Sequence, residues 1–253
     1  HEINANYSAF LVDEENISSL ILSLRTLNIS GINVTVPFKE KLIEFLDKAD
    51  DFVHLCGAVN TIVNNNGIIH GYNTDGPGFL YVLQSVLNLD LLNKNIVILG
   101  AGGTAKSIGC TLVNNFLQSL TIINRTKESL DSLKLLLSSI NQQVPIYGFL
   151  LSDDTIYSKL NDADVVINTT SVGMNSSDKS LLHSMNWVNS NKICIDVIYN
   201  PFETTFLSES RQRGARTLNG LSMLAAQAMF ASEYFTGKTI DFNFIFKQLT
   251  TIK

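Results

Sequence analysis

The sequence predicts an α/β fold whose second half is a parallel sheet covered by helices on both faces. Short apolar runs alternate there with helix-length segments, which is the pattern of βαβ units. The runs lie near Ile96, Leu120, Val144, Val165 and Ile193. The first run, residues 96–99, breaks into a glycine cluster and continues with helical spacing. That order predicts a strand, a tight turn and a helix.

The first 90 residues predict a smaller mixture of strands and helices. Residues 7–12 are expected to be a strand, followed by a helix that Asn16 caps. The apolar positions of this helix recur at 3.6-residue spacing and are Ile17, Leu20, Ile21, Leu24 and Leu27. A second strand is expected at residues 31–36, where Pro37 stops it, and a helix at residues 39–45.

A hairpin and a helix complete this half. Residues 58–63 and 67–72 flank an Asn-rich turn that ends in Gly67, which predicts a hairpin that delivers residues 73–76 at its exit. Helical spacing resumes over 77–87, and residues 88–95 are suited to a linker. Near the C-terminus, residues 221–235 and 240–249 predict two further helices. The expected core positions of the first are Met223, Ala226, Met229 and Phe230.

Composition narrows the function classes. The chain has 253 residues, 45% of them hydrophobic, and a net charge of -5, which disfavours nucleic acid or an anionic membrane as the main partner. Its apolar runs are shorter than the roughly 20 residues of a membrane helix. The cysteines Cys56, Cys110 and Cys194 lack C-x-x-C spacing, which predicts buried thiols in a reducing cytoplasm. The histidines lack zinc-ligand spacing, so no metal site is predicted.

The glycine cluster predicts a dinucleotide site. Gly100, Gly102 and Ala105 have the spacing G-x-G-x-x-A. Gly100 permits the tight turn, and Gly102 lets the backbone approach a pyrophosphate at the helix N-terminus. Ala101, Gly103 and Thr104 complete the expected phosphate-binding segment. The alternative is an ordinary tight turn in an α/β sheet.

The end of the next predicted strand indicates which dinucleotide binds. Where an NAD-specific site places an acidic residue, about 24 residues after Gly100, this chain has Asn124, Arg125 and Thr126. Arg125 can make a bidentate contact with a 2′-phosphate, and its two neighbours can add hydrogen bonds. The expected cofactor is therefore NADP. The alternative is a solvated arginine at the end of a strand.

Several motifs together resemble those of the shikimate dehydrogenases. The first half contains N-V-T-x-P-x-K at 33–39, G-A-x-N-T at 57–61 and G-x-N-T-D-G at 71–76. The second half contains G-A-G-G at 100–103, N-R-T at 124–126, N-T-T-x-x-G-M at 168–174, D-x-x-Y-N-P at 196–201 and G-L-x-M-L-x-x-Q-A at 220–228. The resemblance covers roughly residues 31–237.

The resemblance implies a two-domain enzyme. It implies a substrate-binding α/β domain over 1–90, completed by C-terminal helices at 221–253 that return to it, and a Rossmann NADP-binding domain over 91–220. The implied reaction is the NADPH-dependent, reversible reduction of 3-dehydroshikimate to shikimate in aromatic amino-acid biosynthesis. The implied protein is a cytoplasmic monomer or homodimer.

The resemblance also assigns roles to residues. Lys39 and Asp75 would face each other across the substrate and handle the proton that accompanies hydride transfer, and which of them transfers it stays open. The alternatives are a surface lysine and a helix N-cap. Further residues match positions that contact the substrate, namely Thr35, Asn60, Tyr199 and Gln227. Besides the glycine turn and the N-R-T loop, the cofactor positions are Thr170, Met174 and Gly220.

The chain departs from the family pattern at two places. Phe38 stands where the family often has histidine, and no Ser-x-Ser loop precedes Tyr7. We therefore expect the first strand of the family to be missing from this chain and the sequence to be a truncated piece. Three alternatives remain: a quinate/shikimate dehydrogenase of broader specificity, a non-catalytic ligand sensor on the same scaffold, and the less favoured folate dehydrogenase type.

Overall fold

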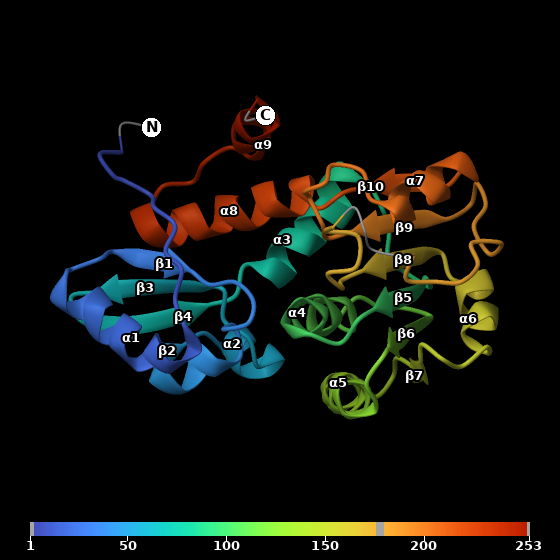
Figure 1. Ribbon diagram of the computed structural model, residues 1–253, viewed down its shortest axis with the longest axis horizontal. Coiled ribbons are helices and arrows are strands. Elements are labelled where there is room, and N and C mark those ends of the chain that lie inside the picture. The colour runs from blue at the N-terminus through green and yellow to red at the C-terminus, as the bar shows by residue number, and fades with distance from the viewer. Residues whose placement is uncertain (1–2, 176–179, 252–253) are drawn as a thin grey trace. The chain divides into compact units, whose positions relative to one another are not determined.

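The computed structural model describes residues 3–175 and 180–251, whose helices and strands are labelled in Figure 1. The chain divides into two compact units. The first comprises the residues up to Gly78 together with those from Ala225 onward, and the second runs from Phe79 to Leu224. Within the described ranges, no helix combines the length and the hydropathy that crossing a membrane requires.

The first unit is built on a four-stranded sheet. Its strands are β1 (Gly31–Asn33), β2 (Lys48–Ala49), β3 (Thr61–Asn65) and β4 (Ile68–Tyr72), in the order β1-β3-β4-β2. The predicted hairpin is confirmed as the antiparallel pair β3 and β4, in which Asn65 pairs with Ile68. Its loop is Asn66-Gly67, with φ of 54° and 89°. Two positive φ values match the twist of the adjoining strands, which explains the Asn-Gly sequence.

The first unit also contains helices. They are α1 (Ile17–Thr26), which follows a 3-10 turn at Glu14–Asn16, a second 3-10 turn at Lys41–Phe45, α2 (Asp51–Cys56), the part of α8 (Leu221–Thr236) from Ala225, and α9 (Phe242–Thr251). Leu24 of α1 is buried with Ile62 and Ile69 in one hydrophobic core. α8 lies close to β1, because a Cβ added at Gly31 would stand 2.5 Å from the ring of Phe235. Glycine at that position thus permits the helix to approach the strand.

The predicted strand at residues 7–12 is wrong. Residues 3–13 form no strand, and Tyr7, Phe10 and Leu11 are 75%, 74% and 99% exposed. A strand needs a hydrogen-bonded neighbour, and in the described part of the chain β1 pairs only with β3. Residues 7–12 therefore pair with no strand in the described part of the chain.

Other predicted elements of the first unit are shorter or different. The second strand ends at Asn33 rather than residue 36, because the chain turns at Thr35, whose carbonyl accepts the amide hydrogen of Phe38. The predicted helix at 39–45 is only the 3-10 turn at Lys41–Phe45. Asn16 precedes α1 as predicted, but its side chain makes no capping hydrogen bond, and Leu27 is 70% exposed.

The second unit is a doubly wound parallel sheet, as predicted. Its strands are β5 (Asn95–Leu99), β6 (Ser119–Asn124), β7 (Ile146–Leu150), β8 (Val165–Asn168), β9 (Ile193–Asp196) and β10 (Arg216–Leu218). The order β10-β9-β8-β5-β6-β7 reverses direction at β5, and every neighbouring pair is parallel. The sequence does not predict β10, which has only three residues and begins with Arg216-Thr217. The carboxyl ends of β5 and β8 meet at the switch point, where such sheets bind ligands.

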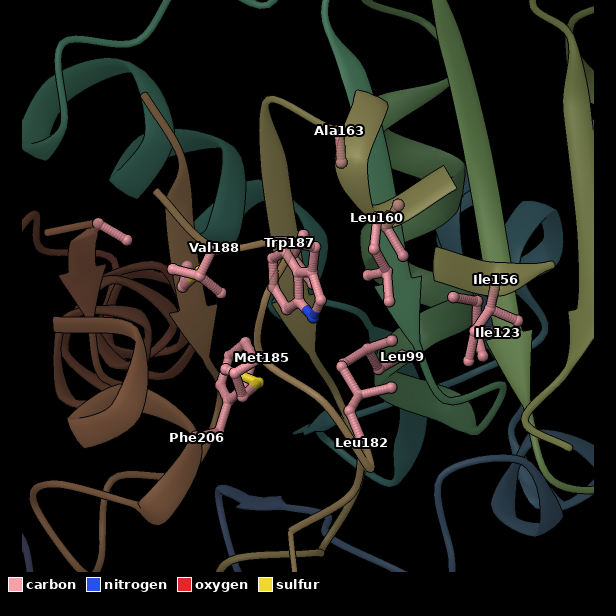
Figure 2. Close-up of a cluster of buried hydrophobic side chains, with 14 of the residues drawn as sticks. Leu99, Ile123, Ile156, Leu160, Ala163, Leu182, Met185, Trp187, Val188 and Phe206 are labelled. Atoms are coloured by element: carbon pink, nitrogen blue, oxygen red, sulfur yellow. The ribbon is translucent and has the colours of Figure 1, made fainter. Parts of the chain in front are cut away.

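Helices cover both faces of this sheet (Figure 1). They are α4 (Gly103–Leu112), α5 (Lys127–Ile140), α6 (Ile156–Asp162) and α7 (Thr205–Gln212). Figure 2 shows the core on one face, where Trp187 is 2% exposed and packs among Leu99, Leu160 and Phe206. α4 and α5 pack closely together, since a Cβ added at Gly109 would lie 2.9 Å from Leu137. All three cysteines are buried, as predicted.

Two helices run from one unit into the other. α3 (Asp75–Tyr81) begins in the first unit and continues into a π-helical turn at Val82–Val86, so the helix predicted for 77–87 is confirmed in place but starts two residues earlier. Residues 88–94 are irregular and belong to the second unit. Of the positions expected to face the core in α8, Met223 and Ala226 are buried, whereas Met229 and Phe230 are only half-buried.

Candidate active site

Lys39 and Asp75 form a shielded ion pair in the first unit. Lys39 Nζ lies 2.6 Å from Asp75 Oδ2, and the side chains are 13% and 7% exposed. An ammonium and a carboxylate in contact can pass a proton to, or take one from, an oxygen bound beside them. Because both groups are screened from bulk water, their electrostatic effect on such an oxygen is larger than in solution.

Asp75 owes its position to the start of α3. Asn73 Oδ1 accepts hydrogen bonds from the backbone N–H of Asp75 at 3.0 Å and of Gly76 at 3.4 Å. Asn73 therefore satisfies the first amides of the helix, which is the role that a helix N-cap performs. The Asp75 carboxylate is directed to Lys39 and Asn60 instead.

Lys39 is held through its backbone. Its carbonyl accepts the N–H of Val59 at 2.8 Å, which ties the loop after β1 to the segment that leads into β3. The same loop contains Thr35, whose side chain is exposed. Val34 N–H donates to the Asn60 carbonyl at 2.8 Å, so the loop is anchored on both sides of Thr35.

Asn60 connects the ion pair to the surrounding loops. Its side chain is 2% exposed, and its Nδ2 donates to Asp75 Oδ1 at 2.8 Å and to Thr74 Oγ1 at 3.0 Å. Its Oδ1 accepts from the Thr74 N–H at 2.8 Å and from Thr61 Oγ1 at 3.0 Å. These donors and acceptors fix which way the amide points. Asn60 thus orients the Asp75 carboxylate.

Gln227 of α8 reaches the same cluster. Its Oε1 lies 3.4 Å from both Asn60 Nδ2 and Thr74 Oγ1. The approach depends on Gly78, where an added Cβ would stand 2.9 Å from the Gln227 backbone nitrogen. The polar residue in the alanine-rich helix therefore lies beside Asn60, as the prediction of a returning helix required.

The glycine turn of the second unit joins β5 to α4. Gly100 has φ of 110°, and an added Cβ would lie 2.6 Å from Thr169 Oγ1, so only glycine fits there. Gly102 precedes α4 and has open space where a Cβ would be. Ala101 and Ala105 are buried, whereas Gly103 and Thr104 are half-buried. The turn therefore combines a tight bend, room at Gly102 and the amide hydrogens of a helix N-terminus, which fit a pyrophosphate.

The N-R-T loop follows β6. Asn124 Nδ2 donates to the carbonyl of Thr126 at 3.0 Å and to its hydroxyl at 3.1 Å, which closes the loop upon itself. Arg125 between them is exposed. An exposed guanidinium at the end of the strand next to the glycine turn is available to a phosphate.

The remaining predicted residues lie on loops at the carboxyl ends of β8 and β9 and before α8. Thr170 is half-buried, Met174 is 55% exposed and Tyr199 is 51% exposed. Gly220 is buried against the β9 loop, where a Cβ would stand 1.9 Å from the Val197 carbonyl oxygen. These four residues belong to the second unit, whereas the Lys39–Asp75 pair belongs to the first.

Sequence reasoning assigned no role to Asn73, Thr74 and Asp196, which shape these sites. All three are buried polar residues, and Asp196 is 0% exposed. A polar residue at the end of an apolar strand was the available signal, since a buried polar group needs partners. Within the described residues, no group of three or more histidine, cysteine or acidic side chains could hold a metal ion.

Comparison with known proteins identifies the family of the chain. A family model described as the shikimate dehydrogenase substrate binding domain matches residues 1–62, and one described as shikimate / quinate 5-dehydrogenase matches residues 82–201. The shikimate dehydrogenase (NADP(+)) of Geobacillus kaustophilus (strain HTA426) is 38% identical over 241 residues, which are 95% of this chain and 85% of that protein.

Solved structures give the same result. The shikimate 5-dehydrogenase of Listeria monocytogenes, crystallised with shikimate and NAD, matches with a TM-score of 0.85 at 29% identity over 95% of this chain and 84% of that one. That of Thermus thermophilus, with NADP(H) and shikimate, matches with a TM-score of 0.82 at 26% identity over 95% and 85%. The chain belongs to the shikimate dehydrogenase family.

Proposed function

We propose that the chain is an NADP-dependent shikimate dehydrogenase that interconverts 3-dehydroshikimate and shikimate. In the reducing direction, one hydride from NADPH and one proton convert the ketone of 3-dehydroshikimate to the secondary alcohol of shikimate. The name of the Geobacillus relative, shikimate dehydrogenase (NADP(+)), supports the activity and the cofactor. The structural observation that carries the proposal is the shielded contact of Lys39 Nζ with Asp75 Oδ2 at 2.6 Å.

The acid–base step belongs to this pair. As hydride adds to the carbonyl carbon, negative charge develops on the oxygen, and the Lys39 ammonium stabilises it and supplies a proton. Asp75 holds Lys39 in place and accepts a hydrogen bond from Asn60. In the oxidising direction, the same groups remove the hydroxyl proton of shikimate.

Polar groups around the pair are proposed to bind the substrate. Thr35, Asn60 and Gln227 offer a hydroxyl and two amides to the hydroxyls and carboxylate of shikimate. Asn60 and Gln227 are brought within 3.4 Å of each other in the first unit, which supports a common role. Tyr199 of the second unit is proposed as a further substrate contact, through its half-exposed phenol.

The second unit is proposed to bind NADP, whose nicotinamide gives or takes the hydride. The open position at Gly102 and the amides at the start of α4 fit the pyrophosphate. Arg125 would pair with the 2′-phosphate, flanked by Asn124 and Thr126. Thr170, Met174 and Gly220 are proposed to line the nicotinamide end.

Turnover of shikimate and of quinate, each with NADP and with NAD, tests the function. We expect NADP-dependent oxidation of shikimate with a kcat/KM at least about tenfold above the value with NAD, because a cation at the 2′-position favours the phosphate. Absence of turnover with all four pairs would contradict the enzyme and leave the ligand sensor.

Quinate turnover decides the second candidate. The family model over residues 82–201 is described for both shikimate and quinate. Oxidation of quinate at a rate comparable to that of shikimate would make the chain a quinate/shikimate dehydrogenase.

The cellular setting is also a proposal. We propose a cytoplasmic protein, because Cys56, Cys110 and Cys194 are free, buried thiols, which suit a reducing compartment. We also propose that it is a monomer or a homodimer. Sedimentation velocity of the purified protein measures the oligomeric state, and a larger assembly would contradict this part.

A further inference from the structure

A buried carboxylate, that of Asp196, lies at the end of β9. Asp196 is 0% exposed, and in the described residues it forms no ion pair. Its Oδ1 accepts from the N–H of Ile198 at 3.0 Å and from Asn168 Nδ2 at 3.2 Å, and its Oδ2 accepts from the Thr204 hydroxyl at 2.7 Å. Burying a carboxylate is costly unless donors surround it, so three donors at one side chain indicate a specific task.

The first partner, Asn168, shapes the loop after β8. Its Oδ1 accepts from the N–H of Thr170 at 3.0 Å and from the Thr170 hydroxyl at 2.7 Å. Its Nδ2, besides donating to Asp196, donates to the carbonyl of Val172 at 3.2 Å. The orientation of this one amide therefore sets the path of residues 168–172, which lead to Met174.

The other two partners shape the loop after β9. Ile198 precedes Tyr199, and its carbonyl accepts the N–H of Gly220 at 2.9 Å. Thr204 Oγ1 in turn accepts from the N–H of Leu207 at 3.3 Å and so caps α7. Asp196 thus ties the end of β8, the end of β9 and the start of α7 together, and reaches the Gly220 turn through Ile198.

We propose that Asp196 is a positioning residue for cofactor binding, which holds the loops after β8 and β9 in the conformation that receives NADP. The inference rests on the proposed function, which places Thr170, Met174 and Gly220 at the cofactor. Since Asp196 itself is fully buried, it acts through Asn168, Ile198 and Thr204 and not by contact with NADP.

The number of hydrogen bonds that each substitution at Asp196 retains predicts the size of its effect. Alanine at 196 leaves three buried donors without an acceptor, which is the costly outcome for hydrogen bonds. Asparagine keeps one oxygen for Ile198 and Asn168, and its amide can donate to Thr204 Oγ1 once that hydroxyl rotates. The order of effects on NADP binding is therefore large for Asp196→Ala and small for Asp196→Asn.

The test compares both variants with Leu160→Ala. Leu160 is fully buried in the same unit but belongs to the hydrophobic core, so its truncation destabilises without touching the network. Calorimetric titration with NADP gives Kd, steady-state kinetics give KM for NADP and for shikimate, and thermal melts give Tm. We expect Asp196→Ala to raise Kd and KM for NADP roughly tenfold or more. KM for shikimate should rise less, because Tyr199 is the one proposed substrate contact on these loops.

The controls separate positioning from stability. Asp196→Asn should return the Kd for NADP to within about threefold of wild type, and Leu160→Ala should lower Tm while leaving Kd unchanged. Wild-type Kd in Asp196→Ala, or an equal rise in Leu160→Ala, would overturn the inference. If Asp196→Ala does not fold, Thr204→Val, which removes the Oδ2 contact and the cap of α7 but keeps both Oδ1 contacts, should show an intermediate Kd, and a wild-type value would overturn the inference.

The binding titration also keeps this inference distinct from the proposed function. A protein that binds NADP but oxidises neither shikimate nor quinate would contradict the proposed activity, while the Kd values of the variants still decide the role of Asp196.

Discussion

At the scale of single residues, the polar groups of the first unit hold the Asp75 carboxylate in one orientation toward Lys39. Asp75 begins a helix, yet Asn73 satisfies the helix amides, so the Asp75 carboxylate is kept for Lys39. Asn60 is buried, and its amide is oriented by hydrogen bonds to the Asp75 carboxylate and from the Thr74 N–H. Each group has one available orientation, which is the preorganisation that acid–base catalysis needs.

Removal of the lysine should abolish most turnover. Lys39→Ala is expected to lower kcat by roughly 10²- to 10⁴-fold, because the developing oxygen charge loses its proton donor. NADP affinity should change little, since the proposed cofactor residues belong to the other unit. Lys41→Ala is the matched control, as Lys41 is an exposed lysine two residues away that pairs with Glu14. Steady-state kinetics of both variants test this, and near-normal kcat in Lys39→Ala would remove Lys39 from the mechanism.

Loss of the arginine should change cofactor preference. Arg125→Ala is expected to raise KM for NADP about tenfold or more and KM for NAD little, because only NADP carries the 2′-phosphate that the guanidinium would bind. Lys127→Ala, which removes an exposed cation from the start of α5, should affect neither. Equal effects of Arg125→Ala on both cofactors would leave the 2′-phosphate assignment without support.

The sequence motifs predict which residues belong to the two sites, but they do not predict the hydrogen bonds between those residues. Lys39, Asp75 and Asn60 stand in recognisable strings, and the structure brings these three together. Asn73 and Thr74 belong to the same motifs, but their side chains hydrogen-bond Asp75 and Asn60 and so orient these residues. Which amide orients which carboxylate depends on backbone paths that the order of residues does not reveal.

At the scale of elements, the turn between β5 and α4 contains two glycines that are needed for different reasons. Gly100 is required by the backbone, since its φ is 110° and Thr169 occupies the place of a side chain. Gly102 has an ordinary φ of -86° and open space around it. Gly100 is thus needed for the fold, whereas Gly102, two residues later, is proposed to be needed for binding.

Alanine substitutions at these glycines should therefore have different effects. Gly100→Ala is expected to cost stability, on the order of 1–3 kcal/mol, through strain and the clash with Thr169. Gly102→Ala should fold like wild type but bind NADP at least about tenfold more weakly, because the new methyl group fills the space proposed for the pyrophosphate. Urea unfolding and NADP titration of the pair measure both effects. Unchanged NADP affinity in Gly102→Ala would argue against that place for the pyrophosphate.

Elements with strong local signals were predictable, whereas weak ones were not. The Asn66-Gly67 turn and the buried strands of the second unit have sequences that suit one conformation. β10 is three residues long and exists because β9 offers it hydrogen bonds. Residues 7–12 have the opposite character, since they are largely apolar, as a strand can be, but pair with no strand among the described residues. Strand formation at a sheet edge depends on a neighbour that local sequence does not describe.

At the scale of the whole molecule, the two units can be followed separately. The chain contains one tryptophan, Trp187, and it is buried in the core of the second unit. Its fluorescence therefore reports the unfolding of that unit, whereas circular dichroism reports both.

The pH dependence of the unfolding free energy, measured by that fluorescence, should reveal the titration of Asp196. Burial raises the pKa of Asp196, so the native state keeps this proton to a higher pH than the unfolded chain does. Between the ordinary value of about 3.9 and the raised one, the native state binds more protons, and the free energy of unfolding falls as pH rises. Asp196→Asn lacks this titration.

Urea unfolding followed by Trp187 fluorescence from about pH 4 to about pH 7 measures the effect. The free energy of unfolding of wild type minus that of Asp196→Asn should decrease across this range. A difference that stays constant with pH, or increases, would show that Asp196 titrates normally or with a lowered pKa.

The discontinuity of the first unit has a consequence for synthesis on the ribosome. The chain leaves this unit at Gly78 and returns to it at Ala225, so all residues of the second unit are translated before the first is complete. Domains generally fold as units while the chain emerges. Gln227, which hydrogen-bonds Asn60, is translated 167 residues after it. The parallel sheet can therefore be finished in the nascent chain while the half that holds Lys39 and Asp75 still lacks the helix that completes it.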